Sequence, residues 1–262
     1  MRNIWAFGWG VLVAILGGLI GLGGAEFRLP VLVSIFNYRT LHAIIINLIV
    51  SLVSVFFSFI FRSGIIGFEN VLANLTVIIN ILAVSLIGSY VGVNYATRIN
   101  ERTLNRVVVV FLFFLSFVLI GHDLIFSVQS WQLPDLVRIG IGFVAGIVIG
   151  IFSSMLGVAG GELIIPTIIL VFAIDIKLAG SLSLAISIPT IIMGLFKYRL
   201  QQRIKEVQSE QKFMISMASG SILGAFIGSN LLRYVTSSAL YVILGVILFL
   251  SALKLARHKV AN

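Results

Sequence analysis

The amino-acid sequence repeats itself at a constant distance. Glu26 and Pro30 recur as Glu162 and Pro166, in each case 136 positions further along the chain. A charged residue, a proline and spaced glycines rarely keep one offset by chance, even in a very apolar chain. We therefore interpret the sequence as two copies of one unit, and a duplication of this kind sets the architecture. The same offset relates Gly21 to Gly157, Gly88 to Gly224, Gly92 to Gly228 and Asn94 to Asn230.

The composition places both copies in a lipid bilayer. Of the 262 residues, 60% are hydrophobic and 10% are charged, and the mean hydropathy is +1.16. A soluble domain carries about 25% charged residues, so this chain has too few charges to cover a surface in water. The net charge of +9 comes from basic residues that lie mostly between apolar segments, as in membrane proteins, which argues against nucleic-acid binding. The sequence contains no cysteine, which excludes disulfides and thiolate chemistry.

Each half contains five apolar segments, and this pattern predicts an all-α integral membrane protein. The second segment of each half is too short to cross about 30 Å of hydrocarbon at about 1.5 Å per residue, so we predict half-helices there. We expect one transmembrane domain over residues 1–262, with repeat 1 at about 4–126, a linker at 127–136 and repeat 2 at about 137–258. The predicted segments are Ile4–Leu22, Phe27–Phe36, Leu41–Phe61, Leu72–Tyr95 and Leu104–Phe126, then Val137–Gly157, Leu163–Phe172, Ala179–Phe196, Phe213–Arg233 and Ala239–Leu255.

Basic residues are distributed unequally between the two copies. Lys197–Lys212 contains five Lys or Arg residues, whereas its counterpart Phe61–Thr76 contains only Arg62. Arg98–Arg106 contains three, and its counterpart Tyr234–Gly245 contains none. Because basic residues near the ends of spans mark the cytoplasmic side, we predict two inverted repeats, with an odd number of crossings each and both termini in the cytoplasm.

A glycine-rich motif stands at the same place in each copy. The first runs Gly21-Leu-Gly-Gly-Ala-Glu-Phe-Arg-Leu-Pro30, and the second runs from Gly157 to Pro166. Glycines release the backbone from helical geometry, and proline favours a first helical turn, so we predict helices that stop, turn and restart inside the membrane. The amide groups of a restarting helix suit an anion. The alternative is that these glycines only let helices pack closely. The predicted anion-binding backbone is at Gly23, Gly24, Gly160 and Gly161.

Three charged residues lie in or beside these motifs. They are Glu26, Arg28 and Glu162, and Arg28 has no charged counterpart, because Ile164 stands at its position in repeat 2. A charge at mid-bilayer costs a few kcal/mol, so such residues pair or face a cavity. We expect Arg28 to bind a substrate anion or to pair with a glutamate. Burial favours the neutral form of a carboxyl group, which would let Glu26 or Glu162 carry a coupled proton. The alternatives are a structural Glu–Arg pair, or glutamates that cap helix N-termini.

Polar residues follow in the next segment of each copy. Asn47 and Ser51 lie in one helical row with Ser54, and Ser183 and Ser187 occupy the matching region. Their hydroxyl and amide groups suit an oxyanion, although such residues also hold membrane helices together. Pro189 predicts a kink in repeat 2 only. Small-residue stripes such as Gly220, Gly224 and Gly228 predict close helix packing, within one chain or in a homodimer.

Several classes of function lack their signatures. The three histidines show no metal-ligand spacing, and no nucleophile elbow, zinc helix or phosphate-binding Walker loop occurs. We therefore expect no catalytic residues, no metal and no cofactor, and no ATP-driven pump in this chain by itself.

The doubled Gly-x-Gly-Gly motif followed by proline, in a chain of this size, resembles the TauE/SafE sulfite exporter family. The resemblance covers nearly the whole chain, with Ala25 and Ala159 at positions where the family motif usually has glycine. It implies a permease of a bacterial-type plasma membrane that moves sulfur-containing anions, such as sulfite or organosulfonates, without ATP.

We therefore predict a secondary transporter of small anions that works by alternating access and is coupled to protons. Two alternatives stay open: a cation-coupled carrier of another small organic anion, and a membrane assembly partner without transport. An intramembrane enzyme is disfavoured by the missing catalytic constellation.

Overall fold

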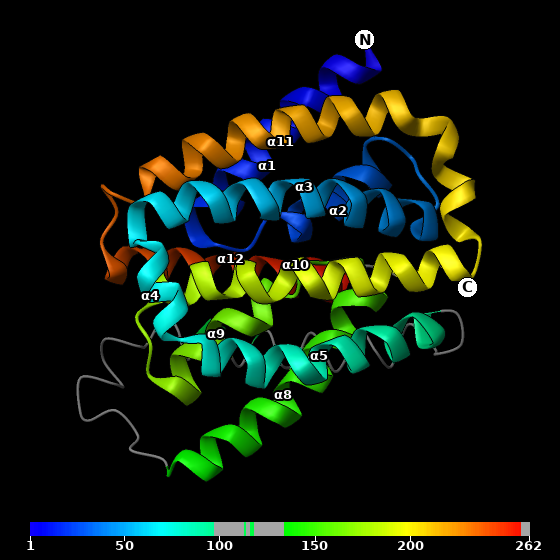
Figure 1. The fold of residues 1–262 in the computed structure, drawn as a ribbon. Helices are drawn as coiled ribbons and strands as arrows, with labels where there is room; N and C mark the ends of the chain where they lie inside the picture. Colours follow the sequence, from blue (N-terminus) through cyan, green and yellow to red (C-terminus); the bar gives the residue numbers. More distant parts are fainter. Residues whose placement is uncertain (97–112, 114–115, 118–133, 258–262) are drawn as a thin grey trace.

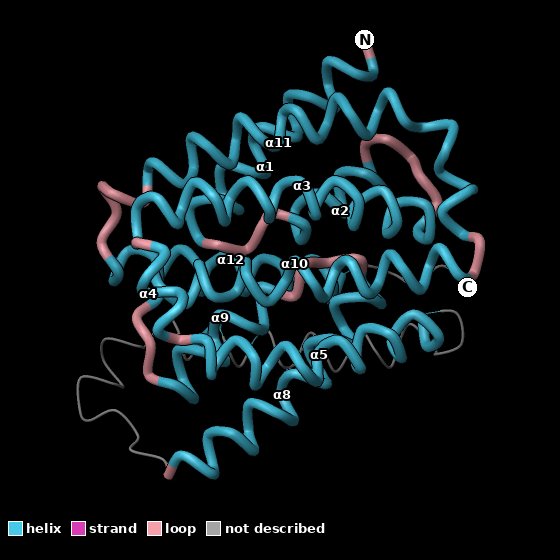
Figure 2. The backbone as a smooth tube through the Cα atoms, in the orientation of Figure 1, coloured by secondary structure: helices cyan, strands magenta, loops and turns pink. Residues whose placement is uncertain are grey.

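The structure, a computed structural model, describes residues 1–96, 113, 116–117 and 134–257 (Figures 1 and 2). Every regular element in this part of the chain is a helix, which confirms the predicted all-α fold. The elements are α1 (Arg2–Ile20), α2 (Ala25–Ser34), α3 (Thr40–Ile66), α4 (Phe68–Ala73), α5 (Leu75–Ala96), α8 (Asp135–Leu156), α9 (Gly161–Phe172), α10 (Ile176–Leu200), the 3-10 helix η1 (Arg203–Glu210), α11 (Gln211–Leu231) and α12 (Ser237–Arg257).

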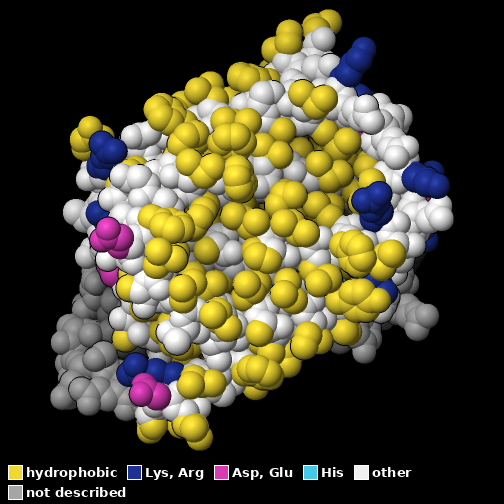
Figure 3. Space-filling view, viewed as in Figure 1, with side chains coloured by type: hydrophobic (Ala, Val, Ile, Leu, Met, Phe, Trp, Pro, Cys, Tyr) yellow, Lys and Arg dark blue, Asp and Glu magenta, His cyan; other side chains and the backbone are white. Residues whose placement is uncertain are grey.

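The protein is a membrane-embedded, multi-pass chain. Within the described residues, six helical stretches are long and apolar enough to cross a bilayer. Figure 3 shows hydrophobic side chains spread over the visible face, with Lys and Arg side chains toward its edges, as a lipid-facing surface requires. The six stretches are Arg2–Ile20, Leu41–Ile66, Leu75–Asn94, Asp135–Met155, Ile176–Leu200 and Arg203–Leu231.

The two half-helices form where the sequence predicts them. α2 has 10 residues and α9 has 12, and each begins two residues before its predicted start. The predicted fifth segment of repeat 1, Leu104–Phe126, and most of the predicted linker lie outside the described residues. Its counterpart in repeat 2 is α12.

The third helix of repeat 1 is longer than predicted. α3 continues to Ile66 instead of ending at Phe61, and the short helix α4 follows it. The residues between the predicted segments Leu41–Phe61 and Leu72–Tyr95 therefore begin inside a helix. This places Arg62 within the helix bundle, where its side chain is fully buried.

The repeats pack by exchanging helices. α1 lies along α11, and α5 lies along α8, so the first helix of each repeat packs on the fourth helix of the other. Glycines make this close approach possible. Gly220 and Gly224 face the backbone of Phe7 and Val11, so α1 and α11 run in the same direction. Gly88 and Gly92 face Ile147 and Ile151 in the same way, so α5 and α8 are also parallel. The stripes serve packing within this chain.

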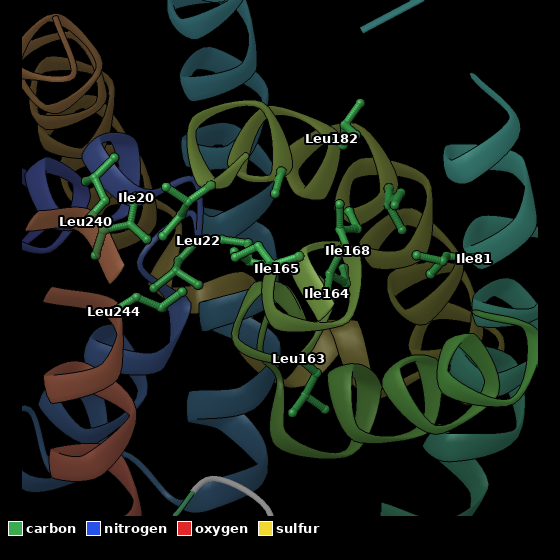
Figure 4. Packing of buried hydrophobic residues seen from close by; sticks show 14 of the residues in the cluster. Ile20, Leu22, Ile81, Leu163, Ile164, Ile165, Ile168, Leu182, Leu240 and Leu244 are labelled. Atoms are coloured by element: carbon green, nitrogen blue, oxygen red, sulfur yellow. The ribbon is translucent and has the colours of Figure 1, made fainter. Parts of the chain in front are cut away.

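The central helices of the bundle are α3 and α10, which contact each other; α3 also contacts α1 and α11, and α10 contacts α5 and α8. The colour order in Figure 1 shows α1, α3 and α11 running one way and α5, α8 and α10 running the other. Leu22 joins the two repeats in the core: Figure 4 shows it beside Ile165 of α9 and Leu244 of α12.

Candidate functional site

Each glycine motif breaks the helix that precedes it. Gly21 ends α1 with φ 96°, and Gly24 precedes α2 with φ 79°. Gly157 ends α8 with φ 66°, and Gly160 precedes α9 with φ 79°. These left-handed conformations carry no Cβ penalty in glycine. The sequence therefore encodes the same stop and restart twice, at the predicted residues.

The two breaks meet in the interior. A Cβ atom built on Gly23 would lie 3.8 Å from the Cβ of Ala159, its neighbour from the other repeat. A Cβ atom on Gly161 would lie 3.0 Å from the Cα of Leu22. The N-termini of α2 and α9 therefore approach each other, and neither has a side-chain cap on its amide groups. Such uncapped first turns present donors and a partial positive charge.

Arg28 lies beside this meeting point and is fully buried. Its Nη1 donates to Oγ of Ser51 at 2.8 Å, and its Nη2 donates to Oγ of Ser221 at 3.2 Å. Its Nε has no hydrogen-bond partner. In the part of the chain that the structure describes, Arg28 forms no salt bridge at contact distance, although its charge and that of Glu26 attract each other over a longer distance. The guanidinium is held by hydroxyl groups and keeps its charge uncompensated at contact distance.

The two glutamates occupy the second residue of their half-helices. The carboxylate oxygens of Glu26 are buried, and no hydrogen bond from another described residue reaches them; the backbone N–H of Glu26 itself is the donor that interacts with them. Glu162 lies close enough to Glu26 for a direct electrostatic interaction between the two carboxyl groups. The structure thus brings together two acids from different repeats and one arginine from repeat 1.

The polar row on α3 and α10 supports the breaks. Asn47 donates to the carbonyl oxygen of Ala25 at 2.9 Å and to that of Gly157 at 2.7 Å, so one amide ties both breaks together. Ser187 donates to the carbonyl of Ala159 at 2.7 Å. Oδ1 of Asn47 and Oγ of Ser183 are buried without a hydrogen-bond partner. Of the predicted polar residues, Asn47 and Ser187 donate hydrogen bonds to backbone carbonyls, and Ser51 accepts one from Arg28.

Ser54 extends this support in repeat 1. Its hydroxyl donates to the carbonyl oxygen of Gly23 at 2.8 Å, inside the first break. Thr190, at the matching position of repeat 2, instead contacts the hydroxyl of Ser85 at 3.0 Å. The breaks share a backbone conformation, but their supporting hydrogen bonds differ.

The prolines lie one turn later than predicted. Pro30 and Pro166 stand inside α2 and α9, each four residues after the glutamate of its motif, rather than in the first turn. A proline has no N–H, so neither can donate to the glutamate carbonyl one turn earlier. Pro189 lies inside α10, which is one uninterrupted helix from Ile176 to Leu200.

Arg62 is a buried residue that the sequence reasoning missed. Its Nη1 donates to the carbonyl oxygens of Gly18 and Leu19 at 3.0 and 2.6 Å, and its Nη2 donates to that of Lys177 at 2.6 Å. It therefore satisfies the last turn of α1, just before the first break, and connects it to α10. The signal was present in the row of polar residues at three- and four-residue spacing along α3, which continues through Ser58 to Arg62.

Ser221 is the second missed residue. It holds Arg28 from α11, a helix of the other repeat, and it lies next to the glycine stripe that predicted packing alone. No sequence signal distinguishes it from the other serines of α11. Among the described residues, no group of three His, Asp or Glu side chains is placed to hold a metal ion.

Comparison with known proteins places the chain in a family. The family model described as sulfite exporter TauE/SafE matches residues 1–119 and 134–261. A protein of Methanocaldococcus jannaschii described as a "probable membrane transporter protein" is 27% identical over 205 residues, which cover 72% of this chain and 69% of the relative. No solved structure matches the chain. The chain belongs to the sulfite exporter TauE/SafE family, whose members are transporters and not enzymes, and it is a membrane transporter.

Proposed function

We propose that this member of the family is a secondary transporter of small sulfur-containing anions, such as sulfite or organosulfonates. The observation that carries the proposal is the environment of Arg28. A buried guanidinium with no salt bridge among the described residues lies where two uncapped half-helix N-termini approach each other. A buried charge is costly unless it is paired, and an oxyanion would supply the pair. Amide donors of Gly24, Gly160 and Gly161 would complete its coordination, whereas the predicted donor Gly23 instead donates to the carbonyl of Gly17 at 3.3 Å.

The two glutamates support proton coupling. Glu26 and Glu162 interact with each other, and an anion that enters beside two ionised carboxylates is repelled by both. Neutralising one of them by a proton removes part of that repulsion. We therefore propose that substrate and proton bind together, and that alternating access moves one repeat against the other.

A second candidate is a cation-coupled carrier, in which the carboxylates bind the coupling ion. No salt bridge joins Arg28 to either glutamate among the described residues, so both carboxylates are available to bind a cation. This observation supports the second candidate. Arg28→Gln separates the two: an anion site fails without the guanidinium, whereas a cation site at the glutamates survives.

Flux into proteoliposomes tests the function. Sulfite, sulfate, thiosulfate and sulfoacetate are compared with carboxylates, with and without a pH gradient. We expect uptake of at least one sulfur anion that a pH gradient accelerates, and a loss of about 100-fold or more in Arg28→Gln, as expected when a buried charge loses its partner. Lys205→Gln removes an exposed positive charge and serves as the control. Unchanged flux in Arg28→Gln would remove this site from the proposal.

The membrane orientation is part of the same proposal. The basic residues of η1 and the ends of its flanking helices favour the cytoplasmic side. Because Arg2, at the start of α1, contacts Glu210 of η1, we propose that the N-terminus of α1 also lies at the cytoplasmic face of a bacterial plasma membrane. Labelling of single introduced cysteines from either side of the membrane checks the orientation, because the natural sequence contains none.

A further inference from the structure

A cluster of polar contacts joins the two repeats at one end of the bundle. η1, from repeat 2, supplies Glu206 and Glu210, and repeat 1 supplies Arg2, Tyr38 and His42 from three separate segments. The Arg2 guanidinium and the Tyr38 hydroxyl both contact one carboxylate oxygen of Glu210, the latter at 2.7 Å. Nε2 of His42 lies 3.1 Å from a carboxylate oxygen of Glu206. We call these five residues the η1 latch.

An aromatic base supports the η1 latch. Phe213, at the start of α11, is fully buried, and its ring meets those of Phe36 and Tyr38 edge-on at centroid distances of 4.8 and 5.4 Å. The Arg2 guanidinium lies over the same ring at 5.3 Å. Burial, together with the hydrogen bond to Glu210, raises the pKa of Tyr38, so the hydroxyl stays protonated and donates. The loop after α2 is therefore held by a polar contact to η1 and by apolar contacts to the start of α11.

The opposite end of the molecule has no such latch in the part that the structure describes. The offset of 136 places Asn70 and Asn74 where η1 has Glu206 and Glu210, and Leu178 where α3 has His42. Arg2 has an equivalent arginine, Arg138, but the two acidic partners are missing. The two asparagine amides donate to the carbonyls of Ile66 and Asn70, within their own chain segment. Among the described residues, ion pairs therefore join the two repeats at the η1 end only. At the opposite end Arg62 joins them through neutral partners, the carbonyl of Lys177 and the hydroxyl of Ser181.

We propose that the η1 latch is a one-sided ion-pair lock on the transporter, which must open for the pathway to open at the η1 end. Opening at the opposite end breaks no ion pair between the repeats in the described part of the chain. The contacts of Tyr38 and His42 join the loop after α2 and the start of α3 to η1. A movement of α3 and this loop away from η1 during alternating access would separate them. The lock biases the protein toward states that are closed at the η1 end. This inference needs only a transporter with two repeats and does not depend on the substrate.

A matched pair of buried alanines provides the test. Ala43 on α3 and Ala179 on α10 occupy equivalent positions in the two repeats, and both are fully buried. A43C and A179C, each alone in the cysteine-free chain, are reacted in membrane vesicles with a thiol reagent that does not cross the bilayer. E206A with E210A breaks the η1 latch, and N70A with N74A is the matched change at the opposite end.

We expect the broken latch to raise the labelling rate of A43C about three- to tenfold, since exposed ion pairs each shift an equilibrium by a small factor. A179C should keep or lower its rate in the same background, and N70A with N74A should leave both rates unchanged. Raised salt should accelerate labelling of A43C in the otherwise native chain, because it screens exposed charges. Y38F should give a smaller acceleration.

Two outcomes would overturn the latch. One is an unchanged rate for A43C after both glutamates are removed. The other is an equal rise at A43C and A179C, which would mean general loosening of the fold. Labelling needs no substrate, so a failure here is separate from a failure to find anion flux.

Discussion

The two helix breaks share a backbone and differ in the side chains around it. Both use a left-handed glycine to end one helix and another to start the half-helix that follows. The break of repeat 1 is surrounded by charge: Arg28 lies beside it, and Arg62 holds the end of α1. In repeat 2 the equivalent residues are Ile164 and Tyr198, and Tyr198 makes one bond, at 3.1 Å, to the carbonyl of Ser154. The duplicated backbone thus builds the scaffold, and its chemistry is concentrated in one copy.

The largest expected effect comes from Arg62, because it donates to three backbone carbonyls in a buried place. Arg62→Met leaves those carbonyls without their donor, and we expect the free energy of unfolding to fall by about 3 kcal/mol or more. Tyr198→Phe removes only one bond at the equivalent position and should cost about 1 kcal/mol. Thermal unfolding of the purified proteins in detergent measures both. Equal losses of unfolding free energy in the two variants would show that Arg62 and Tyr198 stabilise their breaks to the same extent.

Gly21 and Gly157 offer the next comparison. A Cβ atom on Gly21 would lie 2.5 Å from the Cα of Gly180, and one on Gly157 would lie 2.9 Å from the Cα of Ile44. Both substitutions to alanine also force a left-handed conformation, which costs about 1–2 kcal/mol. We therefore expect both to destabilise, by about 2–3 kcal/mol in total, with Gly21→Ala the more severe. The same unfolding assay decides, and Gly64→Ala, where an added Cβ meets nothing within 4 Å, is the control.

The glutamates test whether the two breaks contribute equally to coupling. Glu26→Gln and Glu162→Gln each remove one ionisable group with little change in shape. If protons are carried here, each variant should lose most of its response to a pH gradient while it still binds substrate, because one carboxylate no longer repels the anion. Uptake at a series of internal and external pH values measures this response. A full response in both variants would exclude the glutamates as proton carriers.

The smallest expected difference concerns Ser51 and Ser187, which are equivalent residues with different partners. Ser51 holds the Arg28 guanidinium, whereas Ser187 holds the carbonyl of Ala159. Ser51→Ala should weaken substrate binding a few-fold by releasing Arg28, as expected for one charged hydrogen bond. Ser187→Ala should leave the Michaelis constant unchanged and lower the stability by about 1 kcal/mol. Initial rates of uptake over a range of substrate concentrations separate the two. A matching change in the Michaelis constant of both variants would contradict this division.

The positions of the breaks could be predicted because they depend on local backbone chemistry. Glycine and proline restrict or release φ wherever they occur, so Gly21–Gly24 and Gly157–Gly161 were identified before any contact was known. The placement of Glu26, Glu162 and Asn47 around them followed from the repeat.

The partners of the charged residues could not be predicted, because they depend on which helices cross. Ser221 reaches Arg28 only because α11 packs on α1. The sequence does not show that the first helix of each repeat packs on the fourth predicted segment of the other. Arg62 lies one residue beyond the predicted end of its segment at Phe61, so the sequence does not predict that it is buried. The sequence also does not predict the η1 latch, because its contacts join residues that are far apart in the chain.

The exchange of helices between the repeats also governs how the protein is made. During synthesis α1 emerges long before its packing partner α11, which is made only when repeat 2 is nearly complete. The contact between Phe7 and Gly220 can therefore form only late. Contacts so distant in sequence form late and slowly, and an isolated repeat 1 would expose its glycine stripes and its buried charges to lipid. The two halves are therefore expected to mature as one unit. Two fragments divided between α5 and α8 should each be degraded when alone and should assemble when produced together.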